Sequence, residues 1–198
     1  MGRSSMASSL LHMIRDSVAE PQEMADRLLA QRPRTRIVLE GALLVSVLDA
    51  LLLGILGGGM ASMPTPQGEM AFSPFAHTAV LLASLILSAG ALQVGGQMLG
   101  GKGRFAEALM LVVWLEVLAI VIQAATLLVA LALPPLAGLL GVLGLAVLIW
   151  CVVHFARALH GFPGYGRTIG ALLLGGVVVV IGVSILLAML GFGGPADV

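Results

Sequence analysis

Five long apolar runs constrain what this 198-residue chain can fold into. A helix needs about 20 mostly apolar residues to cross the hydrocarbon core of a bilayer. The runs cover residues 37–57, 77–97, 105–133, 136–158 and 168–190. Pro134 and Pro135 separate the third run from the fourth, because proline lacks a backbone donor and clashes with the preceding helical turn. The sequence therefore predicts five spanning helices.

The composition supports a membrane protein. Hydrophobic residues make up 59% of the chain and charged residues only 10%, whereas a soluble domain is about 25% charged. So few polar groups cannot cover the surface of a soluble fold. We predict an all-α, polytopic membrane protein, a five-transmembrane-helix bundle in contact with the lipid bilayer. The formal net charge is zero, so no nucleic-acid partner is expected.

The basic residues predict an orientation. Residues 1–36 hold six of the ten, residues 98–104 hold two, and residues 157–167 hold two. With five spans, these regions share one side, and short loops rich in lysine and arginine stay in the cytoplasm. We expect a bacterial inner-membrane protein with a cytoplasmic N-terminus and a periplasmic C-terminus. The expected anchors and turn residues are Arg32, Arg34, Arg36, Gly100, Gly101, Lys102, Gly103 and Arg104.

The chain divides into three parts on this basis. Residues 1–36 form an N-terminal cytoplasmic amphipathic segment, residues 37–190 the membrane domain, and residues 191–198 a short tail. Apolar residues Met6, Leu10 and Ile14 repeat at helical spacing, and Pro21 can begin a second short helix. Three interpretations remain open for this segment: a helix lying on the cytoplasmic surface of the bilayer, a helix packed against the turns of the bundle, or a partly ordered tail.

Polar residues inside the spans are candidate intramembrane sites. They are Asp49, Glu116, Gln93 and Gln123. The helical rise places Asp49 about 18 Å and Glu116 about 16 Å along their spans, near the midplane. Ionised groups at that depth are costly and face protein or water, and no cation is expected there to pair with either acid. Either the two acids share a polar interior and take part in proton or ion movement, or each is protonated or hydrogen-bonded to a neighbouring helix and only fixes packing.

Two further sets of residues concern helix edges and faces. Glu40, His154 and Arg157 lie near the cytoplasmic ends of their spans and predict an ion pair or a snorkelling cluster there. Pairs of small residues four apart favour close helix contact in a compact bundle. These pairs are Ala91 and Gly95, Gly96 and Gly100, Ala137 and Gly141, and Ala171 and Gly175.

No motif for catalysis or cofactor binding is present. The chain has no GxSxG, HExxH or GxxxxGK[ST]. Cys151 is the only cysteine, and the four histidines do not form a metal-ligand spacing. We therefore expect no enzyme activity, no catalytic, cofactor or metal residues, and no cofactor. An enzyme acting on lipid is the alternative that a single sequence leaves open.

The turn at residues 98–104 has a structural explanation. Gly100 and Gly101 can end the second span with left-handed geometry, and Glu107 suits the positive end of the third. Lys102 and Arg104 then hold the hairpin on the cytoplasmic side. Contact of these two cations with phosphate or lipid headgroups is the competing interpretation.

Two short stretches carry a family resemblance. Residues 100–103 (GGKG), followed by Phe105 and residues 107–109 (EAL), and the later His160-Gly161 ahead of residues 167–168 (RT), resemble the bacterial branch of the Yip-domain family of Ypt/Rab-interacting proteins. The resemblance covers roughly residues 30–190 and implies five spans with a cytoplasmic N-terminus. Eukaryotic relatives are implied to act in trafficking through small GTPases. Their Asp-Leu-Tyr-Gly-Pro motif is absent here, so that role is not carried over.

Two function hypotheses follow. The first is a non-enzymatic membrane protein that organises membrane or partner proteins, or copies of itself, through helix packing. The alternative is a small transporter, channel or lipid-moving protein that uses Asp49 and Glu116.

Overall fold

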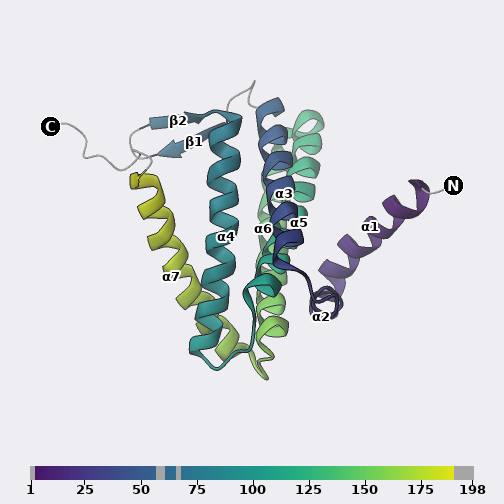
Figure 1. Ribbon diagram of the computed structural model, residues 1–198. Helices are drawn as coiled ribbons and strands as arrows, with labels where there is room; N and C mark the ends of the chain where they lie inside the picture. The colour runs from purple at the N-terminus through teal and green to yellow at the C-terminus, as the bar shows by residue number, and fades with distance from the viewer. Residues whose placement is uncertain (1–2, 57–60, 66–67, 190–198) are drawn as a thin grey trace.

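The computed structural model describes residues 3–56, 61–65 and 68–189 (Figure 1). Its elements are α1 (Arg3–Ala19), α2 (Pro21–Ala30), α3 (Thr35–Leu56), β1 (Ala61–Thr65), β2 (Gly68–Phe72), α4 (Pro74–Met98), α5 (Phe105–Ala132), α6 (Pro134–His160) and α7 (Tyr165–Met189). Helices α3 to α7 are long and apolar enough to cross a membrane. This confirms the prediction of an all-α, five-span membrane protein. The predicted tail at residues 191–198 lies outside the described residues.

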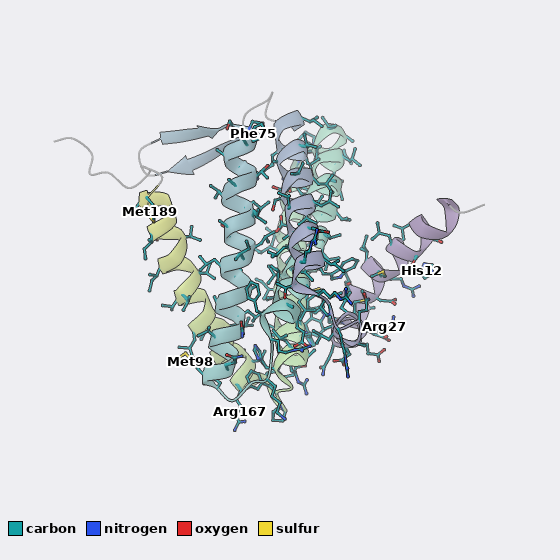
Figure 2. The ribbon with its side chains drawn as sticks, viewed as in Figure 1. His12, Arg27, Phe75, Met98, Arg167 and Met189 are labelled. Carbon is teal, nitrogen blue, oxygen red and sulfur yellow. The ribbon has the colours of Figure 1, made fainter. Side chains whose placement is uncertain are left out.

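The two ends of the bundle differ in character. The α4–α5 and α6–α7 turns lie together at one end, which we call the basic end; Met98 and Arg167 mark it in Figure 2. Phe75 and Met189 mark the opposite end, where β1 and β2 form an antiparallel hairpin with Ala61 opposite Phe72. The glycine- and proline-rich sequence of the α3–α4 connection had not predicted these strands. We call this second end the hairpin end.

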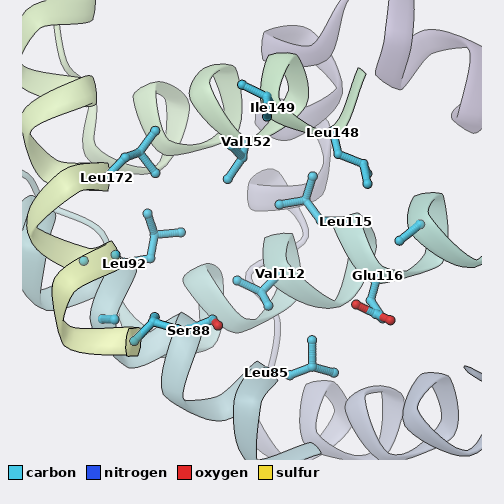
Figure 3. A pocket seen from close by; sticks show the side chains of 15 residues that line it. Leu85, Ser88, Leu92, Val112, Leu115, Glu116, Leu148, Ile149, Val152 and Leu172 are labelled. Atoms are coloured by element: carbon cyan, nitrogen blue, oxygen red, sulfur yellow. The ribbon is translucent and has the colours of Figure 1, made fainter. Parts of the chain in front are cut away.

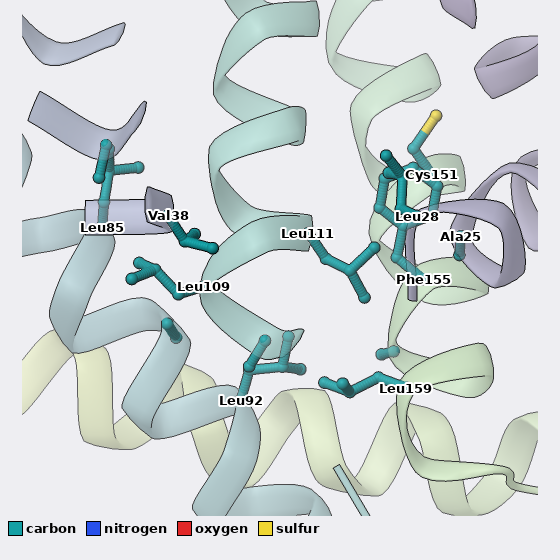
Figure 4. Close-up of a cluster of buried hydrophobic side chains, with 14 of the residues drawn as sticks. Ala25, Leu28, Val38, Leu85, Leu92, Leu109, Leu111, Cys151, Phe155 and Leu159 are labelled. Atoms are coloured by element: carbon teal, nitrogen blue, oxygen red, sulfur yellow. The ribbon is translucent and has the colours of Figure 1, made fainter. Parts of the chain in front are cut away.

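The hydrophobic core centres on α5 and includes part of the N-terminal segment (Figure 4). Leu109 and Leu111 of α5 are fully buried, as is Ala25 of α2. Helix α2 packs against α6 and α5, so it forms part of the bundle core, whereas α1 extends away from the bundle as an arm (Figure 1). The C-terminal turn of this arm is docked, because the indole Nε1 of Trp114 donates to Ser17 Oγ at 2.8 Å.

Helices α4 and α7 approach each other closely through small residues. A Cβ on Gly95 would lie 2.6 Å from the carbonyl oxygen of Ala171, and a Cβ on Gly175 would lie 3.1 Å from that of Ala91. Two of the predicted small-residue pairs therefore meet inside the chain. The close approach requires glycine because the nearest atoms belong to backbone, which cannot move aside.

Candidate functional site

The two turns at the basic end have the same helix-ending geometry. Gly100 ends α4 with φ +84°, and Gly161 ends α6 with φ +65°. Beyond each glycine, a backbone N–H reaches back to a carbonyl five residues earlier: Gly101 to Gly96 at 2.8 Å, and Phe162 to Arg157 at 3.2 Å. This is the Schellman motif, which satisfies carbonyls that a helix end leaves unpaired. It confirms that Gly100 ends the second span in the left-handed conformation.

His160 connects these two turns. Its side chain is buried, with the residue only 2% exposed. The backbone N–H of Gly103 donates to His160 Nδ1 at 3.3 Å. Because Nδ1 accepts, the ring proton of the neutral form sits on Nε2, which donates to the carbonyl of Leu92 at 3.1 Å. The ring therefore bonds the end of α4 and the α4–α5 turn at once.

Three glycines make room for this imidazole, and we call Gly96, Gly101 and Gly103 the glycine seat. A Cβ on Gly96 or Gly101 would collide with the ring, and one on Gly103 would lie 2.8 Å from its Cε1. The ring cannot easily move, because two hydrogen bonds and a stacked Phe162, with ring centroids 5.3 Å apart, hold it. The seat thus explains why this turn is rich in glycine.

The two family-like stretches meet at this point. Sequence reasoning had singled out both, but it had not predicted that His160 lies in the turn formed by the other. The signal that could have suggested it was the cluster of glycines itself, since glycine is the residue required where another group approaches the backbone closely.

The two cations of the α4–α5 turn, Lys102 and Arg104, differ in their contacts. Lys102 is exposed. Arg104 bonds Glu107 through Nε at 2.9 Å, and its backbone N–H donates to the same carboxylate at 3.1 Å. The hydrogen bond with Glu107 stabilises the charged guanidinium and raises the pKa of Arg104 above its ordinary value. Glu107 therefore fixes the first turn of α5, as its position in the sequence had indicated.

The predicted edge cluster is only partly assembled. Tyr165 joins two of its members: its hydroxyl lies 3.2 Å from His154 Nε2, and the Arg157 guanidinium lies over its ring, 4.8 Å from the centroid. Arg157 also donates to the backbone carbonyl of Phe162 at 3.2 Å. Glu40 does not take part, because it pairs with Arg36 at 3.0 Å on its own helix. Arg157 and His154 thus secure the start of α7.

Asp49 has a partner that the sequence analysis missed. His77 of α4 lies with its Nε2 2.8 Å from an Asp49 carboxylate oxygen, and the two side chains are 11% and 9% exposed. Asp49 lies seven residues before the end of α3, about 10 Å by the helical rise. Asp49 therefore lies on the hairpin side of the middle of α3, about 5 Å from the middle by the same rise. The expectation that no cation lies at the depth of Asp49 is therefore wrong if His77 is protonated, because His77, the first residue of the predicted second span, reaches it from α4.

Glu116 lines a separate cavity of about 420 Å³ between α4, α5, α6 and α7 (Figure 3). Its neighbours there, such as Leu115 and Val152, are apolar except for Ser88. Within the described part of the chain the Glu116 carboxylate makes no hydrogen bond or ion pair. Asp49 does not line this cavity.

The other polar candidates do not join them. Gln93 is half-buried on α4, and Gln123 lines a shallow apolar groove between α5 and α6. Among the residues that the structure describes, no three side chains of histidine, cysteine, aspartate or glutamate are close enough together to hold a metal ion. The four predicted intramembrane residues thus form no shared site: Asp49 is paired with His77, Glu116 lines a cavity, and the two glutamines lie elsewhere.

Fold and site together define a polytopic helical membrane protein whose basic-end turns are joined by a buried histidine. The family model described as Yip1 domain matches residues 17–188. The chain therefore belongs to the Yip1 domain family, which confirms the family resemblance. Searches of curated proteins and of solved structures found no match to it.

The glycine seat predicts an energetic coupling between Gly96 and His160. Gly96→Ala should lower the free energy of unfolding by about 1–3 kcal/mol, the range for an overpacked site. In a His160→Ala background the same substitution should cost much less, because the colliding ring is gone. Unfolding in detergent, followed by circular dichroism, measures both. Gly90→Ala on the same helix is the control, since nothing lies within 4 Å of its Cβ. An equal cost of Gly96→Ala in both backgrounds would contradict the coupling.

Proposed function

We propose that this chain is a non-enzymatic membrane protein that organises partner membrane proteins through helix packing. The supporting observation is an open face on the half of α6 that is farther from the basic end. Gly138 and Gly141 lie there with nothing within 4 Å of a Cβ built on either. Exposed Leu139 and Val142 flank them, and α6 is the least buried of the five spans.

Small residues matter here because a bilayer offers no hydrophobic driving force between helices. Helices associate in lipid by close backbone approach and van der Waals contact. Helices α4 and α7 use this mechanism within the chain, through Gly95 and Gly175. The open face of α6 offers the same chemistry to a helix of a partner protein or of a second copy.

A second candidate is a transporter, channel or lipid-moving protein. The buried Asp49–His77 pair favours it, because a carboxylate and an imidazole in contact can exchange a proton. The Glu116-lined cavity favours it as well. The separation of Asp49 from that cavity weighs against a shared pathway for the two acids.

For location, we propose the bacterial branch of the family and the inner membrane. The N-terminus and the basic end would face the cytoplasm, and the hairpin end and the C-terminus the periplasm. Support comes from the segregation of lysine and arginine, because six of the ten lie before α3 or in its first turn and four lie at the two turns of the basic end.

The open face of α6 predicts loss of partners on substitution. Gly138→Leu with Gly141→Leu should reduce the partner recovered in mild detergent about tenfold, equivalent to about 1.4 kcal/mol of binding. Gly90→Leu with Gly166→Leu adds the same bulk at two other open positions and should leave recovery unchanged. Repeated recovery of only the bare monomer of the unmodified protein would count against the proposal.

The transport alternative is tested by flux. In proteoliposomes, the leading proposal expects no more proton or ion flux than in empty vesicles for the unmodified protein, Asp49→Asn and Glu116→Gln. Flux that only the unmodified protein supports would establish the second candidate. Equal flux from all three would remove both acids from any mechanism.

The orientation is tested by charge reversal. Lys102→Glu with Arg104→Glu should weaken the cytoplasmic retention of this turn, because both retained cations become acids. Reporter fusions at the N- and C-termini measure the mixture of topologies. Lys102→Arg with Arg104→Lys keeps both charges and serves as the control. An unchanged topology in the reversed variant would show that other residues set the orientation.

A further inference from the structure

A second cavity opens where the N-terminal segment joins the bundle. It measures about 440 Å³ and lies between the α2–α3 connection, α3 and α5. Its floor is apolar: Ile37 and Val38 of α3, and Met110, Val113 and Trp114 of α5. Its rim is polar, formed by Gln31, Arg32 and Arg34. This size is within the range of small-molecule sites in proteins.

The two rim arginines differ from their neighbours in having no acidic partner. Nearby, Arg27 pairs with Asp16 at 2.8 Å, and Arg36 pairs with Glu40 at 3.0 Å. Within the described residues, the side chains of Arg32 and Arg34 make no hydrogen bond or ion pair. Asp16 and Glu40 are therefore occupied, and two positive charges remain available at the rim.

The position of the cavity makes it accessible to a lipid molecule. Arg32 and Arg34 immediately precede the first residue of α3, so they lie at the edge of a span, at the depth of lipid headgroups. Ile37, one turn further, is 62% exposed on a helix that is apolar enough to cross a membrane. An apolar floor that begins at the hydrocarbon boundary, below a cationic rim, matches an acyl chain below a phosphate.

We propose that this cavity binds an anionic phospholipid. One acyl chain lies along the floor formed by α3 and α5, and the headgroup phosphate is held by Arg32 and Arg34, with Gln31 as a further donor. The N-terminal segment supplies the rim and the membrane bundle supplies the floor, so the bound lipid would join the two parts. This inference does not depend on the partner-organising role proposed above.

Trp114 offers a direct measurement, since it lines the floor and Trp150 is the only other tryptophan. In a Trp150→Phe background, purified protein is mixed with neutral detergent and lipids brominated on the acyl chain, whose bromines quench a tryptophan that they touch. Brominated phosphatidylglycerol should quench Trp114 at a mole fraction at least about tenfold lower than brominated phosphatidylcholine, given the contribution of two basic residues near an anionic headgroup.

Two variants separate the headgroup from the chain. Arg32→Gln with Arg34→Gln should abolish the preference for phosphatidylglycerol. Arg15→Gln with Arg167→Gln, two exposed arginines elsewhere, should leave it intact. Gly41→Leu should weaken quenching by both lipids, because Gly41 lines the cavity and a leucine there would fill part of it. A Cβ at this position would lie 3.9 Å from Val113 Cγ1, so the larger side chain has room to enter.

Three results would overturn the proposal. They are equal quenching by the two lipids, a preference that survives Arg32→Gln with Arg34→Gln, and displacement of phosphatidylglycerol by millimolar inorganic phosphate, which would indicate a simple anion site. Circular dichroism and gel filtration confirm that each variant is folded. If Gly41→Leu alone fails to fold, the arginine variants still decide the matter.

Discussion

The bilayer offers no water to backbone groups, and this constraint organises the whole structure. Every buried N–H and C=O within the hydrocarbon must be bonded internally, so spanning segments are helices and irregular backbone is confined to their ends. In this chain each helix end at the basic turns is closed by its own chemistry. Gly100 and Gly161 end α4 and α6 with matching motifs, and Glu107 secures the start of α5. The turns can therefore be short and well packed.

Close backbone approach follows from the same constraint. Because lipid tails are as apolar as leucine, helices gain most by bringing backbones together and by pairing the few polar groups they carry. Gly95 and Gly175 bring the backbones of α4 and α7 together. His160 pairs polar groups, since its two ring nitrogens bond Leu92 and Gly103 across the basic end. The glycine seat joins both effects at one place, where the two family-like stretches meet.

The sequence predicted what depends on local pattern. Apolar run length determined the number of spans, and each predicted end lies within three residues of the observed one. Glycine and acid positions predicted how α4 ends and α5 begins. What it missed depends on contacts between distant residues. The Asp49–His77 pair joins residues 28 apart, and the seat joins residues 57 apart. The hairpin was missed because its glycines and prolines are typical of loops. The docking of α2 was one of the interpretations left open, because an amphipathic face suits a bundle as well as a bilayer surface.

The acids near or within the spans differ in whether a structural role accounts for them. Glu40 is paired with Arg36, Glu107 with Arg104, and Asp49 with His77, so the cost of placing each in or beside a membrane is offset locally. Glu116 has no such partner among the described residues, and it faces a cavity instead of a side chain. An acid without a hydrogen-bond or ion-pair partner does not stabilise the packing of a helix bundle, and a leucine at the same position would pack better. Glu116 is therefore the intramembrane residue for which a structural role explains least.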